Sequence, residues 1–445
     1  MPPATSASSS SALERDAHLA STDHKVNPNE IAAGVVIGRA SEYFDFFVFG
    51  IGSALVFPKV FFPFADSPLT AMLYSFSIFA LAFAARPIGT AIFMEIGRRH
   101  GRGVKLTIAL FLLGFSTAVI GFLPGYNQIG ISAVYILAAL RIGQGLALGG
   151  AWDGLASLLA LNAPRERRGW YAMIPQLGAP FGFMLASALF SFFVVNLTEE
   201  EFLAWGWRFP FYCAFTINVV ALFARLRLVA TDEFVRLMEQ GKLEPVPVSD
   251  LLRHHAKDVL LGAFVPLASF ALFHLVTIFP ISWITLFTSR SAGEFMMVQF
   301  SGAIVCAGAI AASGLIADQI GRRKALLISA GLIGLFALAS TLAPLIFGES
   351  AIGQTMYVTT GFALLGLSYG QTAGAVTSRL GTRYRYTGAA LTSDLAWLFG
   401  AGFAPLVALS LSAEYGLACV GLYLLSGAVC TIAALLIDRS EMRQM

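Results

Sequence analysis

Apolar runs recur along the chain from residue 31 to residue 437, and short polar or charged turns separate them. A helix of about 20 apolar residues crosses a hydrocarbon core of roughly 30 Å, so each run predicts a membrane-spanning helix. Turn and charge signals divide the chain into twelve such spans. They cover residues 31–57, 69–94, 104–123, 131–160, 169–195, 208–228, 258–288, 295–317, 325–346, 353–377, 386–411 and 416–437.

The basic residues provide a test of this division. Of the 29 Lys and Arg residues, 23 lie in the even-numbered connections and the two tails. The odd-numbered connections contain only Lys59, Arg208 and Arg290, and the spans contain Arg39, Arg86 and Arg141. Because cytoplasmic loops are enriched in Lys and Arg, this alternation supports twelve spans and predicts that both termini are cytoplasmic.

Composition agrees with this pattern. The 445 residues are 57% hydrophobic and only 12% charged, whereas soluble domains are about 25% charged. The sequence therefore predicts an all-α polytopic protein of the cell (inner or plasma) membrane. The net charge of +3 is small, and nothing suggests nucleic acid as a partner.

The chain is expected to divide into two halves of six helices. Residues 1–30 are rich in Ser, Ala and Pro and predict a disordered cytoplasmic tail, without the hydrophobic core of a signal peptide. The first half covers 31–228 and the second covers 258–437. Between them, 229–257 predicts amphipathic helices at the cytoplasmic surface, and 438–445 is a short cytoplasmic tail.

A weak internal repeat supports these halves. The charged turn at Gly101 recurs at Gly321, 220 positions later, and the turn at Gly169 recurs at Gly388, 219 positions later. Two matches at nearly one offset indicate a duplication, as in many secondary transporters.

Several motifs resemble those of one transporter family. GLIADQIGRRK (314–324) is similar to the G-x-x-x-D-x-x-G-R-R/K loop of the major facilitator superfamily, and RIGQG (141–145) resembles its R-x-x-Q-G motif. GRASEYFDFFVFG (38–50) looks like the first-helix signature of the metabolite:proton symporters. Further segments follow in the family's order: RPIGT (86–90), ALGGAWDG (147–154), PQLGAPFG (175–182) and RYTGAA (385–390). The resemblance implies the twelve-helix fold of this superfamily and transport of small metabolites, mostly organic acids and sometimes betaines, with protons.

The sequence also departs from the family at defined positions. The first-half loop has Arg98 where the family has Asp, and Met94 where it has Gly. Arg39 replaces an Asn in the first-helix signature. An acid appears at Asp153, two residues after the position where Glu is common, and Asp394 replaces an uncharged polar residue.

Charges inside the spans are the candidate functional groups, because a charge in the bilayer is costly unless it faces protein or a water-filled cavity. Arg39, Glu42 and Asp45 are spaced i, i+3, i+6 and are expected to share one helix face. Two interpretations remain open: a structural ion network, or a stripe that faces a central cavity opposite Arg141. On the second, Asp45 or Glu42 takes the coupling proton and Arg39 contacts the substrate. Asp394 and Asp153 are further candidates for the protonatable acid.

Substrate contacts are expected from arginines and from polar or aromatic side chains near these acids. The candidates are Arg39, Arg141, Gln144, Tyr43, Trp152, Tyr171, His274 and Trp397. Arg86 lies next to a proline in RPIG. It is expected to form a structural ion pair or to take part in gating of the transporter. The resemblance adds the cytoplasmic loop residues Asp318, Gly321, Arg322 and Arg323 as conformational elements.

The leading interpretation is a proton-coupled importer of a small organic acid or a similar polar metabolite. Uptake of a zwitterion such as a betaine, drug:proton antiport and a transporter-like sensor remain as alternatives. An enzyme is not expected, since no nucleophile–His–acid set is present, and neither is an ATP site, a cofactor or a metal. The expected partners are a substrate that carries a carboxylate, protons and the lipid bilayer, with the protein acting as a monomer.

Overall fold

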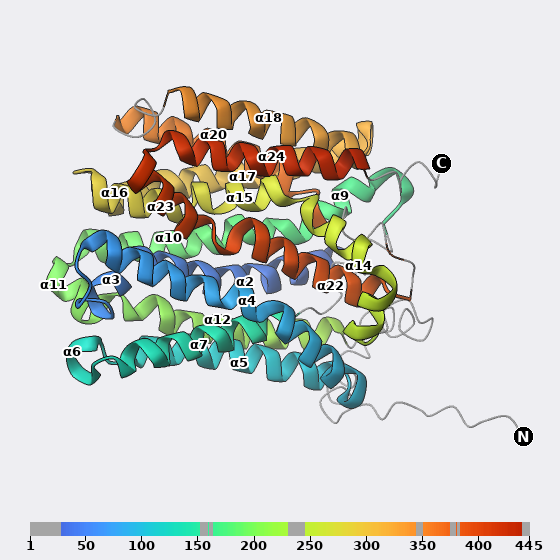
Figure 1. The fold of residues 1–445 in the computed structure, drawn as a ribbon. Coiled ribbons are helices and arrows are strands. Elements are labelled where there is room, and N and C mark those ends of the chain that lie inside the picture. The colour runs from blue at the N-terminus through green and yellow to red at the C-terminus, as the bar shows by residue number, and fades with distance from the viewer. Residues whose placement is uncertain are drawn as a thin grey trace, which may run out of the picture.

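The computed structural model describes residues 28–151, 159, 163–229, 245–343, 350–373, 380 and 383–437. Within these ranges the regular structure is helical, with no strand. The long helices run side by side along one direction (Figure 1). Trp152 and Asp153, most of the linker between the halves and both tails lie outside the described residues.

The first half contains six spanning segments, at the positions that the apolar runs predict. They are α2 (Pro28–Leu55), α4 (Pro68–His100), α5 (Arg102–Phe122), α7 (Ser132–Gly150), the run of α9 (Arg168–Met173), η2 (Ile174–Leu177) and α10 (Gly178–Asn196), and α12 (Arg208–Val229). Short elements join them: α3 (Phe57–Val60), α6 (Tyr126–Ile129), η1 (Arg165–Arg167), α11 (Glu199–Glu201) and η3 (Phe202–Gly206).

The second half repeats this order. Its segments are the run of α14 (Val248–Phe264), α15 (Leu267–Val276) and α16 (Ile278–Phe287), then α17 (Ala292–Ile320), α18 (Arg322–Leu342), α20 (Ala351–Tyr369), the run of α22 (Arg385–Ala396), η4 (Trp397–Gly402) and α23 (Ala404–Tyr415), and α24 (Ala418–Ile437). The all-α fold with twelve spanning segments agrees with the sequence prediction.

Nine helical segments among the described residues are long and apolar enough to cross a membrane. The first segment, α2, is not one of the nine, although it is 28 residues long. It carries Arg39, Glu42 and Asp45 in its middle, and all three must be accommodated inside the protein.

The glycine turns of the sequence repeat have the same backbone conformation in both halves. Gly101 joins α4 to α5 with φ 84° and ψ 168°, and Gly321 joins α17 to α18 with φ 85° and ψ 147°. A positive φ is readily adopted only by glycine, so each turn needs this residue. The shared geometry supports the duplication that the sequence indicates.

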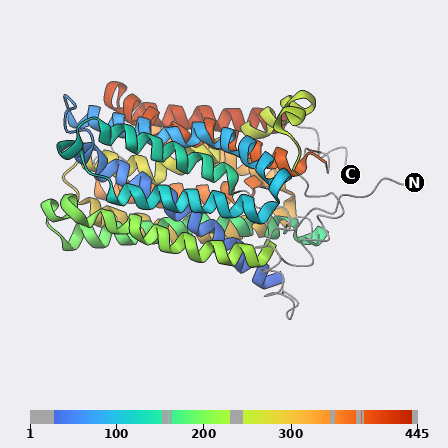
Figure 2. The ribbon, with the colours of Figure 1, turned by 90° about the horizontal axis from the view of Figure 1, so that it is seen from below.

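Helices of the first half pack directly on helices of the second. α10 packs on α17, α4 packs on α22, η4 and α23, and α2 packs on α16. In Figure 1, α5, α7 and α12 of the first half and α18, α20 and α24 of the second lie on opposite sides of the bundle. The view from below also shows the long helices running side by side (Figure 2).

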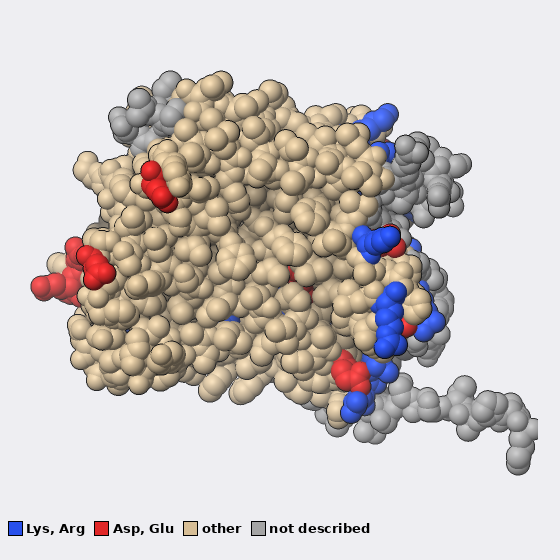
Figure 3. Space-filling view, in the orientation of Figure 1, with Lys and Arg blue, Asp and Glu red and all other residues tan. Residues whose placement is uncertain are grey.

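Surface charge is unevenly distributed along the bundle. On the face shown in Figure 3, Lys and Arg gather at the end where α14 and α22 begin, and the opposite end, near α11, shows acidic residues. This distribution matches the alternation of basic connections along the sequence.

Spans seven and eleven are locally irregular where they approach the centre. Span seven breaks between α15 and α16 at Thr277, which has φ −102° and ψ −67°. Gln299 of α17 donates its side-chain amide to the carbonyl oxygens of Val276 and Thr277, at 2.8 and 2.7 Å. Span eleven has a π-helical turn, η4, which begins at Trp397, three residues after Asp394. Such breaks in membrane helices are tolerated where the freed backbone groups find new partners.

Candidate functional site

A pocket lies between the halves near the middle of the bundle. It contains Arg39, Glu42 and Trp397, which the sequence predicted, together with Tyr369 and with Gln176, which was not among the candidates. The remaining lining residues are Val35, Ala151, Pro175, Phe270, Thr372, Ala373, Ala389 and Ser393. α2 and η2 contribute one wall, and α15, α20, α22 and η4 contribute the other.

An ion pair forms part of the first wall. Arg39 Nη1 donates to Glu42 Oε2 at 2.5 Å, and its Nη2 donates to the Tyr43 hydroxyl at 3.3 Å. The Tyr43 hydroxyl is in turn hydrogen-bonded to the hydroxyl of Tyr369 on α20. This contact connects the ion pair of the first half to the second half.

Asp45 does not face this pocket, so the expectation that all three charges share one face is wrong for this residue. Six positions turn an α-helix by about 600°, which leaves Asp45 roughly 120° around the axis from Arg39. Its carboxylate accepts a hydrogen bond from Asn218 Nδ2 at 2.5 Å. Asn218 Oδ1 accepts from the Ser41 hydroxyl at 2.9 Å. Asp45 therefore lies against α12, inside the first half.

A chain of polar side chains separates Asp45 from Arg141. Arg141 Nη1 donates to Gln144 Oε1 at 3.0 Å, and Gln144 Nε2 donates to the Thr117 hydroxyl at 2.8 Å. Thr117 lies beside the Asp45 carboxyl. The two charges that the sequence placed opposite one another are thus connected through uncharged groups, and they make no direct ion pair.

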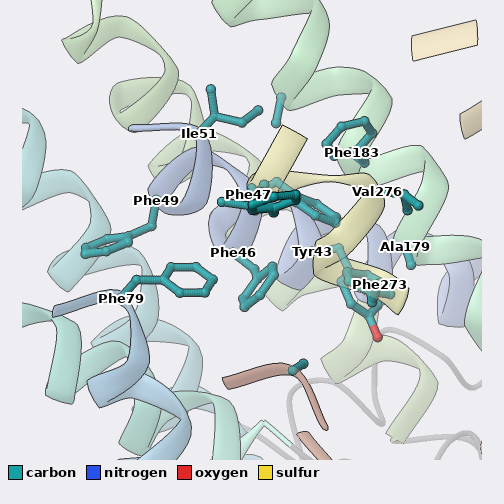
Figure 4. Close-up of a cluster of buried hydrophobic side chains, with 14 of the residues drawn as sticks. Tyr43, Phe46, Phe47, Phe49, Ile51, Phe79, Ala179, Phe183, Phe273 and Val276 are labelled. Atoms are coloured by element: carbon teal, nitrogen blue, oxygen red, sulfur yellow. The ribbon is translucent and has the colours of Figure 1, made fainter. Parts of the chain in front are cut away.

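Arg141 is surrounded mainly by aromatic rings. Its side chain is fully inside the protein, at 1% exposure. Nε donates to the carbonyl oxygen of Phe79 at 3.1 Å, and the guanidinium lies 4.0 Å from the ring centre of Phe49 and 4.8 Å from that of Phe79. Figure 4 shows these rings in the buried cluster. In the described part of the chain, the ion pairs within 4 Å include none made by Arg141.

A second ion pair joins the two halves directly. Arg86 Nε, on α4, donates to Asp394 Oδ1, on α22, at 3.0 Å; the Asp394 side chain is buried and that of Arg86 is partly buried. The hydroxyl of Thr90 is hydrogen-bonded to the same carboxylate and lies 3.1 Å from the carbonyl oxygen of Gly149. The Arg86 guanidinium also lies 5.7 Å from the ring centre of Trp397, which lines the pocket.

The loop motif GLIADQIGRRK of the second half contacts the first half through Asp318. Its carboxylate accepts from the backbone N–H groups of Gly169 at 2.6 Å and Trp170 at 3.2 Å. Both belong to the first turn of α9, where the helix dipole and the free N–H groups favour a negative charge. Asp318 is thus a cap on a helix of the opposite half.

The other predicted loop residues have different roles in the structure. Gly321 forms the turn with positive φ, and Arg322 begins α18. Arg323 donates to the carbonyl oxygen of Leu435 at 2.8 and 3.1 Å, which ties α18 to the end of α24 in the same half. Tyr171, a predicted substrate contact, is half-buried and packs against the core, and it is not among the residues that line the pocket.

In the first half, different residues contact the opposite half. Arg98 pairs with Glu95 at 2.7 Å on the exposed surface. Lys105 donates to the Tyr386 hydroxyl at 3.1 Å, and the Arg102 guanidinium lies 4.8 Å from the ring centre of Tyr386. The sequence departure at Arg98 therefore coincides with a cation–aromatic contact in place of a carboxylate cap.

Uncharged polar residues are what the sequence reasoning missed. Gln176 Nε2 donates to the Thr372 hydroxyl at 3.0 Å across the halves, and Thr90 and Asn218 hold the two buried aspartates. The available signal was an amide or hydroxyl inside an apolar span, but such groups are too frequent in spans to be selected without the structure.

Comparisons with known proteins agree with this architecture. A sequence profile of the Major Facilitator Superfamily matches residues 35–405. The chain is 38% identical to the inner membrane metabolite transport protein YhjE of Escherichia coli K12 over 94% of this chain and 95% of the relative. It is 30% identical to the shikimate transporter of the same organism, over 91% and 92%.

Among solved structures, the chain resembles the partially occluded, inward-open form of the xylose transporter XylE from E. coli. The TM-score is 0.68 at 16% identity, and the match covers 93% of this chain and 98% of the other. At this identity the similarity concerns the fold alone.

Proposed function

Because the chain belongs to the Major Facilitator Superfamily, we propose that it imports a small organic acid together with protons, by alternating access. The family and the inner-membrane relative support a multi-pass transporter of the inner membrane, and the substrate and the coupling ion are the proposed part. The basic connections indicate that both termini face the cytoplasm.

The observation that carries this proposal is the pocket between the halves, with an arginine–carboxylate pair in its wall. Arg39 and Glu42 line the pocket, and the Tyr43–Tyr369 contact connects this wall to the opposite half. A substrate carboxylate can compete with Glu42 for the guanidinium, since both are carboxylates that accept a charge-assisted hydrogen bond from it. The acid that is released can then take a proton, so that anion and proton bind together.

The inter-half pair offers a second position for the same exchange. Asp394 is held by Arg86 and Thr90 from the first half. Protonation of this acid would weaken the attraction to Arg86 and favour separation of α4 from α22. Substrate and proton occupancy at these two sites would thus bias the rocking of the halves.

The test is uptake into proteoliposomes that contain the purified protein. Shikimate, lactate and citrate are offered with an inward-directed proton gradient, and then with an uncoupler. The proposal expects accumulation above equilibrium that the uncoupler abolishes. Uptake that only equilibrates, at the same rate with and without the gradient, contradicts proton symport.

A zwitterion is the second candidate, because the pocket presents both signs of charge beside aromatic rings. Arg39 and Glu42 lie in the same wall, and Phe270 and Trp397 line the pocket as well. Aromatic faces bind quaternary ammonium groups through cation–π attraction. Glycine betaine in the same assay separates the two: accumulation of betaine and exclusion of every carboxylate favours the zwitterion.

A further inference from the structure

Two buried polar atoms near the centre of the bundle have no hydrogen-bond partner in the described part of the chain. They are Arg141 Nη2 on α7 and His274 Nε2 on α15. Arg141 is 1% exposed and His274 is 0% exposed. Leaving such groups unpaired costs about 1–3 kcal/mol each, more for a charged group, so a pair of them needs an explanation. The two residues belong to opposite halves.

Both residues contact the same two aromatic rings. The Arg141 guanidinium is 4.8 Å from the ring centre of Phe79 and 5.9 Å from that of Phe46. The His274 ring centre is 5.3 Å from each of these two rings. Figure 4 shows Phe46 and Phe79 with their rings toward one another. Arg141 and His274 therefore belong to one aromatic cluster.

The hydrogen bonds of Thr277 fix which nitrogen of His274 carries a hydrogen. The Thr277 hydroxyl has a single hydrogen and donates it to the carbonyl oxygen of Phe273 at 2.8 Å. Its 3.3 Å contact with His274 Nδ1 is then a bond that Nδ1–H donates. In the neutral ring, Nε2 therefore carries a lone pair, and this atom is free to accept a proton.

Arg141 is the charged group that acts on His274 within this cluster. Asp45 reaches Arg141 only through Gln144 and Thr117, and Glu42 is paired with Arg39. The Arg86–Asp394 pair contacts Trp397, whose ring centre is 6.5 Å from that of His274.

The helices that pack on α15 add no further charge beside the imidazole. Among these helices, α18 has charged residues only in its first turn and α23 only in its last turn. The described parts of α16, α20, η4 and α24 contain no charged residue. A proton on Nε2 would meet Arg141 without an acid between them.

We propose that Arg141 and His274 form a carboxylate clamp across the two halves, and that His274 Nε2 takes up a proton when the anion binds. This inference rests on the proposed function and assigns its proton to a histidine, in place of the acids that the sequence suggested. The carboxylate accepts from Arg141 Nη2 on one side and from the new Nε2–H on the other. The proton comes from water, and the imidazole lone pair becomes the N–H bond.

Electrostatics makes the two events depend on one another. A protonated His274 beside Arg141 places two positive charges in one apolar site, and an anion between them removes this repulsion. Conversely, an anion held by Arg141 gains a second charge-assisted hydrogen bond only if His274 is protonated. One proton would thus accompany each carboxylate.

Phe46 and Phe79 contact both residues in this structure, and the Phe46 ring is stacked on the imidazole of His274. Phe46 is on α2 of the first half, whereas His274 is on α15 of the second. When the halves rock apart, the stacked contact between Phe46 and His274 must separate, which uncovers both polar atoms. Binding of the anion would draw Arg141 and His274 together and close the site.

The test measures binding and proton uptake on the purified protein. Lactate, benzoate and shikimate are compared with lactamide and benzamide, by thermal shift and by a pH indicator in weakly buffered solution. The clamp predicts that at least one carboxylate raises the melting temperature, that the amides do not, and that about one proton is taken up per bound anion.

The informative variant is His274→Gln, because a glutamine amide can still donate a hydrogen bond but cannot be protonated. We expect about tenfold weaker carboxylate binding, no proton uptake, and affinity that no longer depends on pH between 6 and 8 (about the range in which histidines titrate). His254→Gln on α14 is the matched control, since His254 is exposed and outside the cluster; it should behave like the wild type.

Any one of three results overturns the clamp. In the thermal-shift assay, either no carboxylate stabilises the wild type, or carboxylates and amides stabilise it equally. In the proton-uptake assay, His274→Gln takes up as many protons as the wild type does. The liposome assay keeps these results separate from the proposed function. Uncoupler-sensitive uptake that survives in His274→Gln leaves proton symport intact and removes the clamp. If the wild type takes up a proton on binding a carboxylate but shows no gradient-driven uptake, the clamp is supported and proton symport is contradicted.

Discussion

Arg86 and Asp394 form a buried ion pair of 3.0 Å between α4 of the first half and α22 of the second. The two residues are 308 positions apart in the sequence. A charge pair at this position must break or rearrange whenever the two helices separate, so it links the charge state of one carboxyl to the conformation of the protein.

We expect that Asp394→Asn destabilises the protein by about 3–5 kcal/mol, because Arg86 is left as a buried charge without its acid. The apparent melting temperature in detergent should fall. The double variant Arg86→Gln/Asp394→Asn removes both charges and should recover part of this loss. If the double variant is as unstable as the two single losses added together, the two residues do not act as a pair.

A second prediction concerns the Asp318 cap on α9. Asp318→Asn keeps the shape of the side chain but removes the charge and one of the acceptors for the Gly169 and Trp170 N–H groups. The cytoplasmic contact between the halves should weaken, and the population with that side open should rise. Accessibility of cysteines introduced on the two sides measures this change.

Arg98→Ala is the control for this experiment, since Arg98 pairs with Glu95 on the exposed surface. It should shift accessibility less than Asp318→Asn does. The reverse order would mean that the first-half loop is the stronger contact.

Gly169→Ala tests the contact between α9 and Asp318 of α17 by adding a methyl group, without changing any charge. A methyl group at Gly169 would lie 2.8 Å from Asp318 Oδ1 and 2.8 Å from the carbonyl oxygen of Gly314. The backbone must move to relieve this overlap, so we expect the same shift in cysteine accessibility together with lower stability. Unchanged accessibility would show that α9 and α17 are not in close contact in the dominant state.

A further prediction concerns Asp45. Asp45→Asn can still accept from Asn218 and fits the same space, so the protein should fold and remain in detergent solution. If the chain of polar groups from Asp45 to Arg141 takes part in coupling, proton-driven accumulation is lost while exchange of substrate across the membrane continues. Asn218→Ala, which removes the partner but leaves the acid, should reduce stability without abolishing coupling.

Arg141→Lys is expected to abolish accumulation. A lysine cannot bond the Phe79 carbonyl oxygen and Gln144 Oε1 together while its charge stacks on Phe49, as the planar guanidinium does. The measurement is uncoupler-sensitive uptake at equal protein content. Normal accumulation with unchanged pH dependence in both Arg141→Lys and Asp45→Asn would make these residues a structural network.

The sequence by itself determined the class of the protein, the number of its spans and the place of its turns. These features follow from local rules: an apolar run of sufficient length becomes a helix in lipid, and a glycine such as Gly101 or Gly321 is required where φ is positive. The alternation of basic connections and the order of motifs also lie within the chain itself, so no structure was needed to detect them.

Only the tertiary structure decided which charges meet. Asp394 and Arg86 come from spans eleven and two, and Asp45 turns away from Arg39 toward Asn218 although it lies only six positions further along α2. His274 and Arg141 are brought to the same pair of rings from opposite halves. Such pairings depend on the rotation of each helix about its axis and on the packing of distant helices, and helix periodicity leaves both undetermined.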